Sequence, residues 1–584
     1  MKKVSLFKKV VLGTGLLLCA TSMSARTIFV AANGSWESDG SSSSNPAKFA
    51  NAMLNGDEGE EGIMKSGDKI VVMPGTQQIE GTINIEGLDV EFIGYQTIDD
   101  VDFTATGNSI IDGKGTQRLF NITGSSQVKF AHLTFQNASS AANGGSAITA
   151  DASIVDIGNC GFLANKAQGA TDAIGAYGGA IKAVSGSTLN LYNVTFDGNT
   201  AFRGGAVSVN GSTMKAEYCF FWSNSTVYND GEARGGAVFA SDANLNFNFC
   251  DIKGNTSLRQ GGAFFIVGDS KTEIKHSGIT GNHSGTGYNS ETETGETDNH
   301  GGVFCIFGAP KTTIINSTIG NNYAAGPNAV GGILYGGGDE FTLINVTVTN
   351  NYTDGNIDHC GAFNFGSAMT AINIFNSIIE RNKTNSDHNW SDINITGLAT
   401  VVTVEGSVCG STKAAEPDNI FSDDGTYLKY SYDPLPYSDP LDDPLGDPNK
   451  NVSGITINGM KKTCFPLQAS AVAKGIGIAL LLPGDGGKYY DQYLNERIPA
   501  DGTIYAGAVQ ILESEDEKLN PQLAPANPYY DPFMTTGLSD VATDGNDATV
   551  VGYYTILGQK LNKEPESGVF ILQYSDGKFV KVLK

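Results

Sequence analysis

The chain has 584 residues, of which 74 are glycine, and its charged residues make up 17% against a usual share of roughly 25%. Many glycines with few charges argue against a coiled coil or a helical solenoid, and an apolar content of 40% argues against disorder. The net charge of −25 argues against a nucleic-acid partner. These numbers favour an acidic, glycine-rich, all-β protein.

Residues 1–25 have the pattern of a secretory signal peptide. Four lysines among the first nine residues precede an apolar run, Val10–Ala20, that is too short to span a bilayer. Small residues follow this run, so we expect cleavage near Ala25 and a protein that is secreted or held on the outer-membrane surface. A lipid anchor on Cys19 is the less favoured alternative, because Leu18 stands where such signals need a small residue.

Residues 26–68 are predicted to form an N-terminal cap that covers the open end of a solenoid. Asn45 as N-cap, Pro46 in the first turn and Gly56 at the end predict a short helix that runs through Leu54. Three strands are expected to lead from this cap into the repeats. They are Lys69–Met73, Thr82–Glu86 and Val90–Ile93.

Two motifs alternate along the middle of the chain, one copy of each in every repeat. The first places an aromatic or aliphatic residue three positions before an asparagine, at Asn165, Asn199, Asn224, Asn255, Asn282, Asn322, Asn351 and Asn382. The second is a Gly-Gly pair, which begins at Gly144, Gly178, Gly204, Gly235, Gly261, Gly301 and Gly331 and becomes Cys360-Gly361 in the last copy. Apolar and polar residues alternate between them, so each repeat predicts three short strands and one coil of a right-handed parallel β-helix over residues 69–410.

Stacked coils predict ladders of equivalent side chains. One column lies three residues before the aromatic or aliphatic position, and we expect its asparagines to form a structural ladder: Asn159, Asn193, Asn316, Asn345 and Asn376. The next column is small throughout and contains Cys160, Cys219 and Cys250. We interpret these cysteines as small apolar core residues with free thiols, although Cys219 and Cys250 lie at a spacing that a disulfide also spans.

The paired motifs, clearest over Phe196–Val207, resemble the repeats of the polymorphic outer membrane proteins, a family of β-helical, adhesin-like surface proteins. The resemblance covers roughly residues 130 to 385 and implies a pectin lyase-like solenoid. Residues 411–510, with Phe465–Ala471 and Ala506–Gln510, resemble the closing segment of secreted bacterial β-helix proteins. Residues 546–584 resemble the small C-terminal β modules that direct type IX secretion in Bacteroidetes, which implies an export machinery as a partner. Residues 511–545 are expected to be a linker.

The main candidate site is the column of residues directly before each Gly-Gly pair: Tyr177, Arg203, Arg234, Gln260, His300, Val330 and His359. Guanidinium groups in successive coils, about 4.8 Å apart, would bind a carboxylated glycan through bidentate hydrogen bonds. The longest repeat inserts an acidic segment, 285–299, beside this column. The plainer interpretation is that Arg and His cap a turn, and it takes precedence because the column is not uniform.

Other candidates are weaker. Trp222 and Trp390 are candidates for stacking on sugar rings, although a half-buried strand position is the simpler account. Asp433, Asp439, Asp443 and Asp447 each precede a proline, but their spacing matches no known calcium loop. We therefore expect no metal and no cofactor, with calcium as a weak alternative.

Three functions are compatible with this sequence. We favour an exported, adhesin-like or glycan-contacting β-helix without catalytic activity, whose partner is a host or environmental glycan or surface. The first alternative is a polysaccharide lyase or hydrolase acting on an acidic glycan. For a lyase, Arg203, Arg234, His300 and His359 would be the candidate catalytic residues. The second alternative is a purely structural surface protein.

Overall fold

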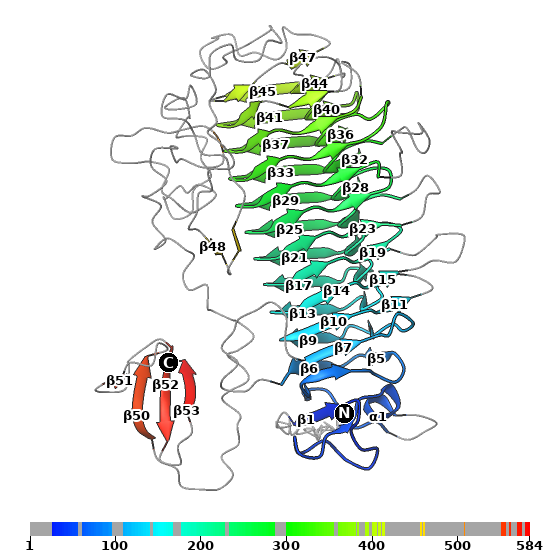
Figure 1. Ribbon diagram of the computed structural model, residues 1–584, viewed down its shortest axis with the longest axis vertical. Coiled ribbons are helices and arrows are strands. Elements are labelled where there is room, and N and C mark those ends of the chain that lie inside the picture. Colours follow the sequence, from blue (N-terminus) through cyan, green and yellow to red (C-terminus); the bar gives the residue numbers. More distant parts are fainter. Residues whose placement is uncertain are drawn as a thin grey trace, which may run out of the picture.

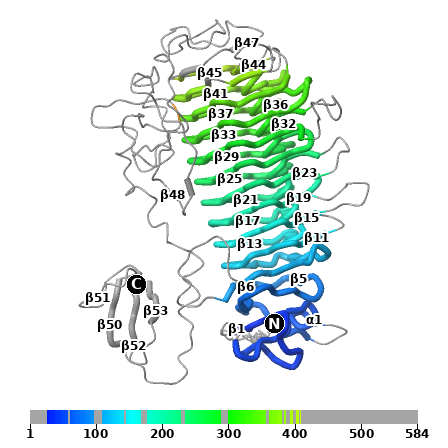
Figure 2. The backbone as a smooth tube through the Cα atoms, viewed as in Figure 1, coloured from blue at the N-terminus to red at the C-terminus, as the bar shows by residue number. Residues whose placement is uncertain are grey.

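The computed structural model describes residues 26–56, 61–95, 109–140, 144–167, 177–227, 233–286, 299–355, 360–380, 382–384, 392–395, 400–405, 407–409 and 412–414. It also describes 456–457, 460–461, 507, 550–555, 560–561, 569–574 and 579–583. Strands from successive coils stack into four long parallel sheets, which confirms the right-handed parallel β-helix (Figure 1). Figure 2 shows the backbone tube winding up this stack from the blue N-terminal coils to the yellow-green ones.

Sheet 1 has 14 strands and contains the first strand of each coil. In spatial order they are β2 (Ala47–Lys48), β1 (Thr27–Ala31), β3 (Lys69–Val72), β6 (Asp89–Gly94), β9 (Gln127–Ala131), β13 (Ile154–Gly158), β17 (Thr188–Tyr192), β21 (Thr213–Glu217), β25 (Asn244–Asn248), β29 (Lys271–Lys275), β33 (Lys311–Ile315), β37 (Glu340–Ile344), β41 (Ala371–Phe375) and β45 (Val401–Glu405).

Sheet 2 has 12 strands, mostly of three or four residues. They are β4 (Gly75–Gln77), β7 (Ser109–Asp112), β10 (Leu133–Gln136), β14 (Gly161–Leu163), β18 (Thr195–Asp197), β22 (Phe220–Trp222), β26 (Asp251–Lys253), β30 (Gly278–Thr280), β34 (Thr318–Gly320), β38 (Thr347–Thr349), β42 (Ile378–Glu380) and β46 (Val408–Cys409).

Sheet 3 consists of nine strands of two residues each, so a coil has four strands and the prediction of three was wrong. They are β11 (Ser139–Ser140), β15 (Lys166–Ala167), β19 (Thr200–Ala201), β23 (Ser225–Thr226), β27 (Thr256–Ser257), β31 (His283–Ser284), β35 (Tyr323–Ala324), β39 (Tyr352–Thr353) and β43 (Lys383–Thr384). Two residues are too few to show an alternating pattern in the sequence.

Sheet 4 has 12 strands and closes each coil before the chain returns to sheet 1. They are β5 (Ile83–Glu86), β8 (Phe120–Thr123), β12 (Ile148–Asp151), β16 (Ile181–Val184), β20 (Val207–Asn210), β24 (Val238–Ser241), β28 (Phe264–Gly268), β32 (Phe304–Gly308), β36 (Leu334–Gly336), β40 (Phe363–Phe365), β44 (Ile393–Ile395) and β47 (Thr412–Ala414).

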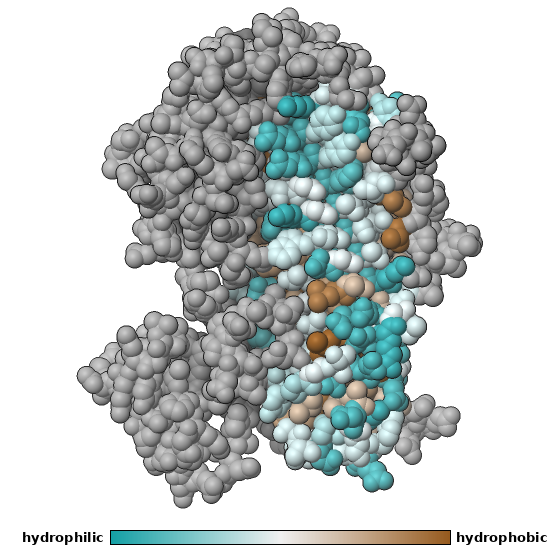
Figure 3. Space-filling view, in the orientation of Figure 1, coloured by the Kyte–Doolittle hydropathy of each residue, from teal (hydrophilic) through white to brown (hydrophobic). Residues whose placement is uncertain are grey.

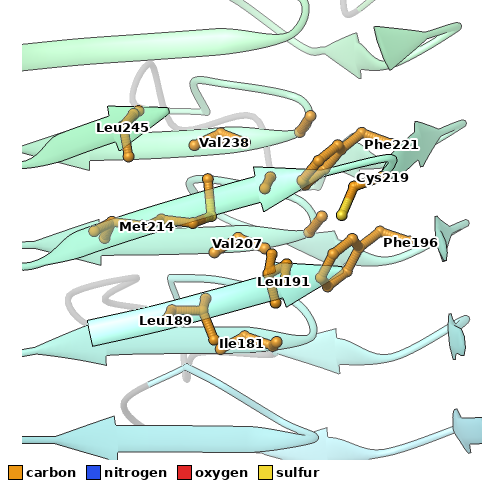
Figure 4. Close-up of a cluster of buried hydrophobic side chains, with 14 of the residues drawn as sticks. Ile181, Leu189, Leu191, Phe196, Val207, Met214, Cys219, Phe221, Val238 and Leu245 are labelled. Atoms are coloured by element: carbon orange, nitrogen blue, oxygen red, sulfur yellow. The ribbon is translucent and has the colours of Figure 1, made fainter. Parts of the chain in front are cut away.

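The hydrophobic core fills the inside of the coils. In Figure 4, side chains from sheets 1, 2 and 4 meet there, among them Leu191, Phe196 and Val207. Phe196 and Phe221 lie in adjacent coils, as predicted, with ring centroids 4.9 Å apart and an interplanar angle of 14°. Each fully buried apolar side chain contributes about 1.5–3 kcal/mol, so stability accumulates coil by coil.

The asparagines of the first motif form the longest buried ladder of the described chain. From Asn199 to Asn382, each side-chain Oδ1 accepts hydrogen bonds from the backbone N–H and the Nδ2 of the previous asparagine, at 2.8–3.1 Å, and the first of these donors is Asn165. Asp392 ends the ladder, because its Oδ1 accepts from both groups of Asn382. The repeat of these residues was predicted from the sequence, but their hydrogen bonds to each other were not.

The asparagine column predicted as a ladder also exists, in two separate pieces. Asn193 Nδ2 donates to Asn159 Oδ1 at 2.6 Å, and Asn345 Nδ2 donates to Asn316 Oδ1 at 2.9 Å. These residues, with Asn376, have φ between 47° and 55°, the left-handed conformation that asparagine tolerates. Between the two pieces the same column is aromatic, with Tyr218, Phe249 and His276 stacked on each other.

The five cysteines whose side chains the structure describes are buried free thiols, as predicted. They are Cys160, Cys219, Cys250, Cys305 and Cys360. Burial, and next the neighbouring Cys250, raise the pKa of the Cys219 thiol, which keeps it protonated. The remaining cysteines lie outside the residues whose side chains are described.

The N-terminal helix begins later than predicted. α1 spans Asn51–Asn55 and its N-cap residue is Ala50, which makes no side-chain capping bond. The residues expected to start the helix instead form β2, in which Ala47 pairs with Val30 of β1. Backbone pairing and the complete burial of Phe49 outweigh the local Asn-Pro signal. Gly56 does end the helix, at φ 87°.

The C-terminal segments are described in part. β50 (Val550–Thr555), β51 (Lys560–Leu561), β52 (Val569–Tyr574) and β53 (Phe579–Leu583) form a small antiparallel sheet in the order β51-β50-β52-β53. β48 (Thr456–Ile457) and β49 (Met460–Lys461) form a separate antiparallel pair. Gly507 N–H donates to Asn376 O at 2.7 Å, so a residue of the predicted closing segment contacts the β-helix. The domain boundaries themselves stay predictions.

Candidate functional site

The corner between sheets 3 and 4 contains the Gly-Gly pairs and most of the length variation among the coils. From Gly-Gly to the end of the next sheet 3 strand, the coils keep nearly the same length, 23 residues in 204–226 and in 235–257 and 24 in 301–324. The connection from sheet 3 to the next Gly-Gly pair instead ranges from two residues (202–203) to sixteen (285–300). Variable connections on a rigid scaffold are typical locations for binding residues.

The two glycines of a pair have different roles. Gly235 has φ 71°, a conformation that side chains disfavour. A Cβ on Gly236 would lie 2.1 Å from Gly262 O in the next coil and 2.5 Å from Thr256 O. The corner is therefore tight enough to fix the position of the residue that precedes each pair.

In the structure, residues of the predicted site column pair with one another from coil to coil over most of the length of the column. Tyr177 pairs with Arg203, Arg203 with Arg234, and Arg234 with Gln260. Further along, His300 pairs with Val330. His359 lies outside the described residues. The structure thus brings Tyr177, Arg203 and Arg234 together, as the sequence predicted.

The two arginines lie against aromatic rings. Arg203 Cζ is 5.3 Å from the ring centroid of Tyr177, 5.8 Å from that of Phe202 and 5.5 Å from that of Phe239. Arg234 Cζ is 4.9 Å from the Phe265 ring. Phe239 and Phe265 are on the outer face of sheet 4 and are nevertheless buried. A guanidinium over an aromatic face gains about 0.5–2 kcal/mol, so these contacts also stabilise the corner.

Three more cations belong to this corner, and they were not predicted from the sequence. Arg118 Nη2 donates to Ser140 Oγ at 3.0 Å and to Gly144 O at 2.9 Å. Lys182 Nζ lies 5.9 Å from the Tyr177 ring centroid, and burial, followed by the nearby Arg118 charge, lowers its pKa. Arg259 is adjacent to Gln260 of the column.

The charge of this corner is exceptional for so acidic a chain. Only seven arginines occur in 584 residues, and four of them gather here. We call Arg118, Arg203, Arg234 and Arg259 the arginine corner. The charges of Arg234 and Arg259 both act on the buried Cys305 thiol, whose pKa burial nevertheless raises. The sequence feature that points to Arg118 and Arg259 is therefore the scarcity of arginine in the rest of the chain.

Besides Tyr177 and the two arginines, His300 is the only titratable residue of the column in the described chain. Its ring centroid lies 4.2 Å from that of Tyr335, with an interplanar angle of 39°, and the side chain is half-buried. This contact fixes the imidazole against sheet 4, so the structural interpretation of His300 as a turn residue also has support.

Trp222 is not part of the arginine corner. It ends β22 in sheet 2, and its Nε1 donates to Asp251 Oδ2 at 3.0 Å. Its ring contacts Phe220 at 5.3 Å, so the half-buried strand position is the better account. Trp390 lies outside the described residues, as do Asp433, Asp439, Asp443 and Asp447. In the described residues, no group of three potential metal ligands occurs.

A second aromatic ladder follows the outer face of sheet 3. The ring centroids of His283 and Tyr323 are 4.5 Å apart, and those of Tyr323 and Tyr352 are 5.3 Å apart. The Tyr323 hydroxyl donates to Asp354 Oδ2, which also accepts from Gly326 N–H at 3.0 Å. The rings of His283, Tyr323 and Tyr352 pack on one another in succession, so we interpret this ladder as a stabilising element.

His283 makes the ladder sensitive to acid. Burial lowers its pKa from 6.5 to about 4, although Asp354 acts in the opposite direction. The unfolded chain binds a proton near pH 6.5 and the folded chain only near pH 4, so stability falls as the pH drops through this window. We expect a loss of about 2–3 kcal/mol between pH 7 and pH 4.5 through this residue.

The matched variant for this prediction is His283→Tyr, which extends the tyrosine column without a titrating ring. Its urea midpoint should fall less than that of the wild type between pH 7 and pH 4.5. Equal losses in the two proteins would show that His283 does not carry the effect.

Comparison with known proteins adds little beyond the fold. No family model and no curated protein matches the sequence. Among solved structures, the chain is similar to pectate lyase Pel9A, with 13% identity and a TM-score of 0.35 over 84% of this chain and 97% of that one. It is also similar to a rhamnogalacturonan lyase, with 11% identity and a TM-score of 0.32 over 75% of this chain and 95% of that one. Similarity at this level transfers no residue role.

Proposed function

We propose that this protein is an exported surface β-helix that binds an acidic glycan at the arginine corner and does not cleave it. The observation that carries the proposal is the gathering of four of the seven arginines at one corner of a chain with net charge −25. Export is proposed from the signal-like residues 1–25 and the sorting-like residues 546–584. Among the described residues, no helix has the length and apolarity needed to cross a membrane.

The geometry is suited to binding carboxylates. Stacking on Tyr177, Phe239 and Phe265 uses the flat faces of the guanidinium groups, whereas carboxylates bind at the edges that carry the N–H donors. Aromatic support also holds each long side chain in place, which reduces the entropy lost when a ligand binds. An anionic chain would meet a local positive charge on a molecule whose net charge is −25.

The experiment compares polygalacturonate with its methyl ester, which lacks the charge. We expect wild-type protein to bind polygalacturonate, and Arg203→Ala/Arg234→Ala to bind it at least tenfold more weakly. Arg203→Lys/Arg234→Lys keeps the charge but loses the planar guanidinium fork. Its affinity should therefore lie between that of the wild type and that of the double alanine variant. Lys166→Ala/Lys253→Ala removes two charges from sheets 3 and 2 and should leave binding unchanged. Equal affinity of all four proteins would contradict the proposal.

The alternatives give different results in the same assay. A lyase would release an unsaturated product that absorbs in the ultraviolet, and Arg234→Ala or His300→Ala would abolish that signal. Such a result would replace the binding proposal by catalysis. A purely structural surface protein would neither bind nor cleave any glycan of the panel.

A further inference from the structure

The outer face of sheet 1 has a shallow groove, away from the Gly-Gly corner. Its volume is about 330 Å³, and it crosses four consecutive strands, β21, β25, β29 and β33. The outward-pointing side chains that line it are Thr213, Lys215, Asn244, Asn246, Lys271, Glu273, Lys311 and Thr313. The described surface in Figure 3 is mostly hydrophilic or neutral, with few hydrophobic residues.

Three exposed lysines give this groove a positive charge. Lys271 and Lys311 are direct cross-strand neighbours in the register of β29 and β33, about 4.8 Å apart as adjacent strands are. Like charges in direct opposition destabilise a sheet. Lys215 lies two strands away, on β21. The described residues include no carboxylate in an ion pair with any of the three.

The carboxylates nearest in register are engaged by other groups. Glu273 accepts a hydrogen bond from Asn246 Nδ2 at 2.8 Å and pairs with Lys275 Nζ at 2.8 Å. Glu340 stands opposite Lys311, but its Oε1 accepts from Thr342 Oγ1 at 3.0 Å and from Asn373 Nδ2 at 3.3 Å. None of these bonds joins a carboxylate to the three lysines, and Glu273 and Glu340 offset the positive charge of the groove only in part.

We propose that this groove binds a linear polysaccharide with acidic groups on successive residues, lying along the axis of the β-helix. Lys271 and Lys311 would contact its acidic groups in adjacent coils, and Lys215 would contact a group further along. The amide of Asn244 and the hydroxyls of Thr213 and Thr313 supply hydrogen bonds for sugar hydroxyls between the charges. This site is separate from the arginine corner and uses point charges in place of planar forks.

The test uses dextran sulfate against neutral dextran, and polygalacturonate against its methyl ester, with the full-length mature protein. We expect wild-type protein to bind at least one of the charged polymers and neither neutral one. Lys271→Ala/Lys311→Ala should weaken that binding at least fivefold, with a smaller salt dependence. Lys166→Ala/Lys253→Ala carries the same charge change on other faces and should bind as the wild type does. The exposed positions make misfolding a small risk, which thermal unfolding of each variant checks.

The binding assay distinguishes between the two proposed sites. If Arg203→Ala/Arg234→Ala abolishes binding and Lys271→Ala/Lys311→Ala does not, the groove proposal is wrong and the arginine corner stands. If only the lysine variant loses binding, the groove is the site and the arginine proposal is wrong. Equal losses in the lysine variant and its matched control would mean a nonspecific charge effect and would overturn the groove proposal.

Discussion

Asn255→Ala is expected to destabilise the β-helix by at least about 3 kcal/mol. It removes four buried hydrogen bonds and leaves three polar groups without that partner, with about 1–3 kcal/mol lost for each group left unsatisfied. The Oδ1 of Asn255 accepts from the backbone N–H and the Nδ2 of Asn224, both at 3.0 Å. Its Nδ2 donates to Phe221 O at 2.8 Å. The bond to Asn282 Oδ1 is lost as well, but that oxygen still accepts from the Asn255 backbone N–H.

Urea unfolding followed by circular dichroism measures this effect. Asn321→Gly is the matched control, because Asn321 is exposed, has φ 57° and lies outside the ladder. Glycine keeps that conformation, so a change below about 0.5 kcal/mol is expected there. A comparable loss in both variants would mean that the buried amide ladder contributes no special stability.

Gly236→Ala is expected to destabilise the protein by at least about 3 kcal/mol, the upper end of overpacking effects. Both atoms that the new methyl group would meet, Gly262 O and Thr256 O, belong to backbone. Neither can move alone, because Gly262 N–H donates in turn to Gly301 O and Thr256 N–H to Asn224 O. The strain would therefore pass to the neighbouring coils.

Gly254→Asn is the control within the same coil. A Cβ on Gly254 meets nothing within 4 Å, and its φ of 64° is close to that of Asn321 and Asn350 at equivalent corners. We expect a change below about 1 kcal/mol in the urea midpoint. If Gly236→Ala is as stable as Gly254→Asn, close packing of the coils at the Gly-Gly corner is not what holds them together.

Much of the fold was readable from the sequence because each repeat must satisfy the same local geometry. A Gly-Gly pair needs a left-handed residue and then a residue without a side chain, as Gly235 and Gly236 show. The buried asparagine also recurs in every repeat, because each copy bonds the equivalent asparagine of the neighbouring coil. The N-terminal helix was misplaced because a local cap signal at Asn45 competes with pairing between Ala47 and Val30, two distant segments.

The candidate site was predictable only in part. The Tyr177–Arg203–Arg234 column follows from the register of the repeats, so counting along the chain found it. Arg118 belongs to a coil without the Gly-Gly motif, and Lys182 lies on a strand, so neither shares the column position. Trp222 was predicted as a candidate for stacking on a sugar ring, but its strand belongs to sheet 2, away from the Gly-Gly corner.

The sequence by itself determined how the chain winds, since inward side chains and corner glycines repeat under the same steric constraints in every coil. Only the tertiary structure decided what the outer faces present. Outward side chains are free of that constraint, and their neighbours come from coils that are 25 to 40 residues away in the chain. The charge of a face, such as the lysine pair of β29 and β33, appears only when those coils are stacked in register.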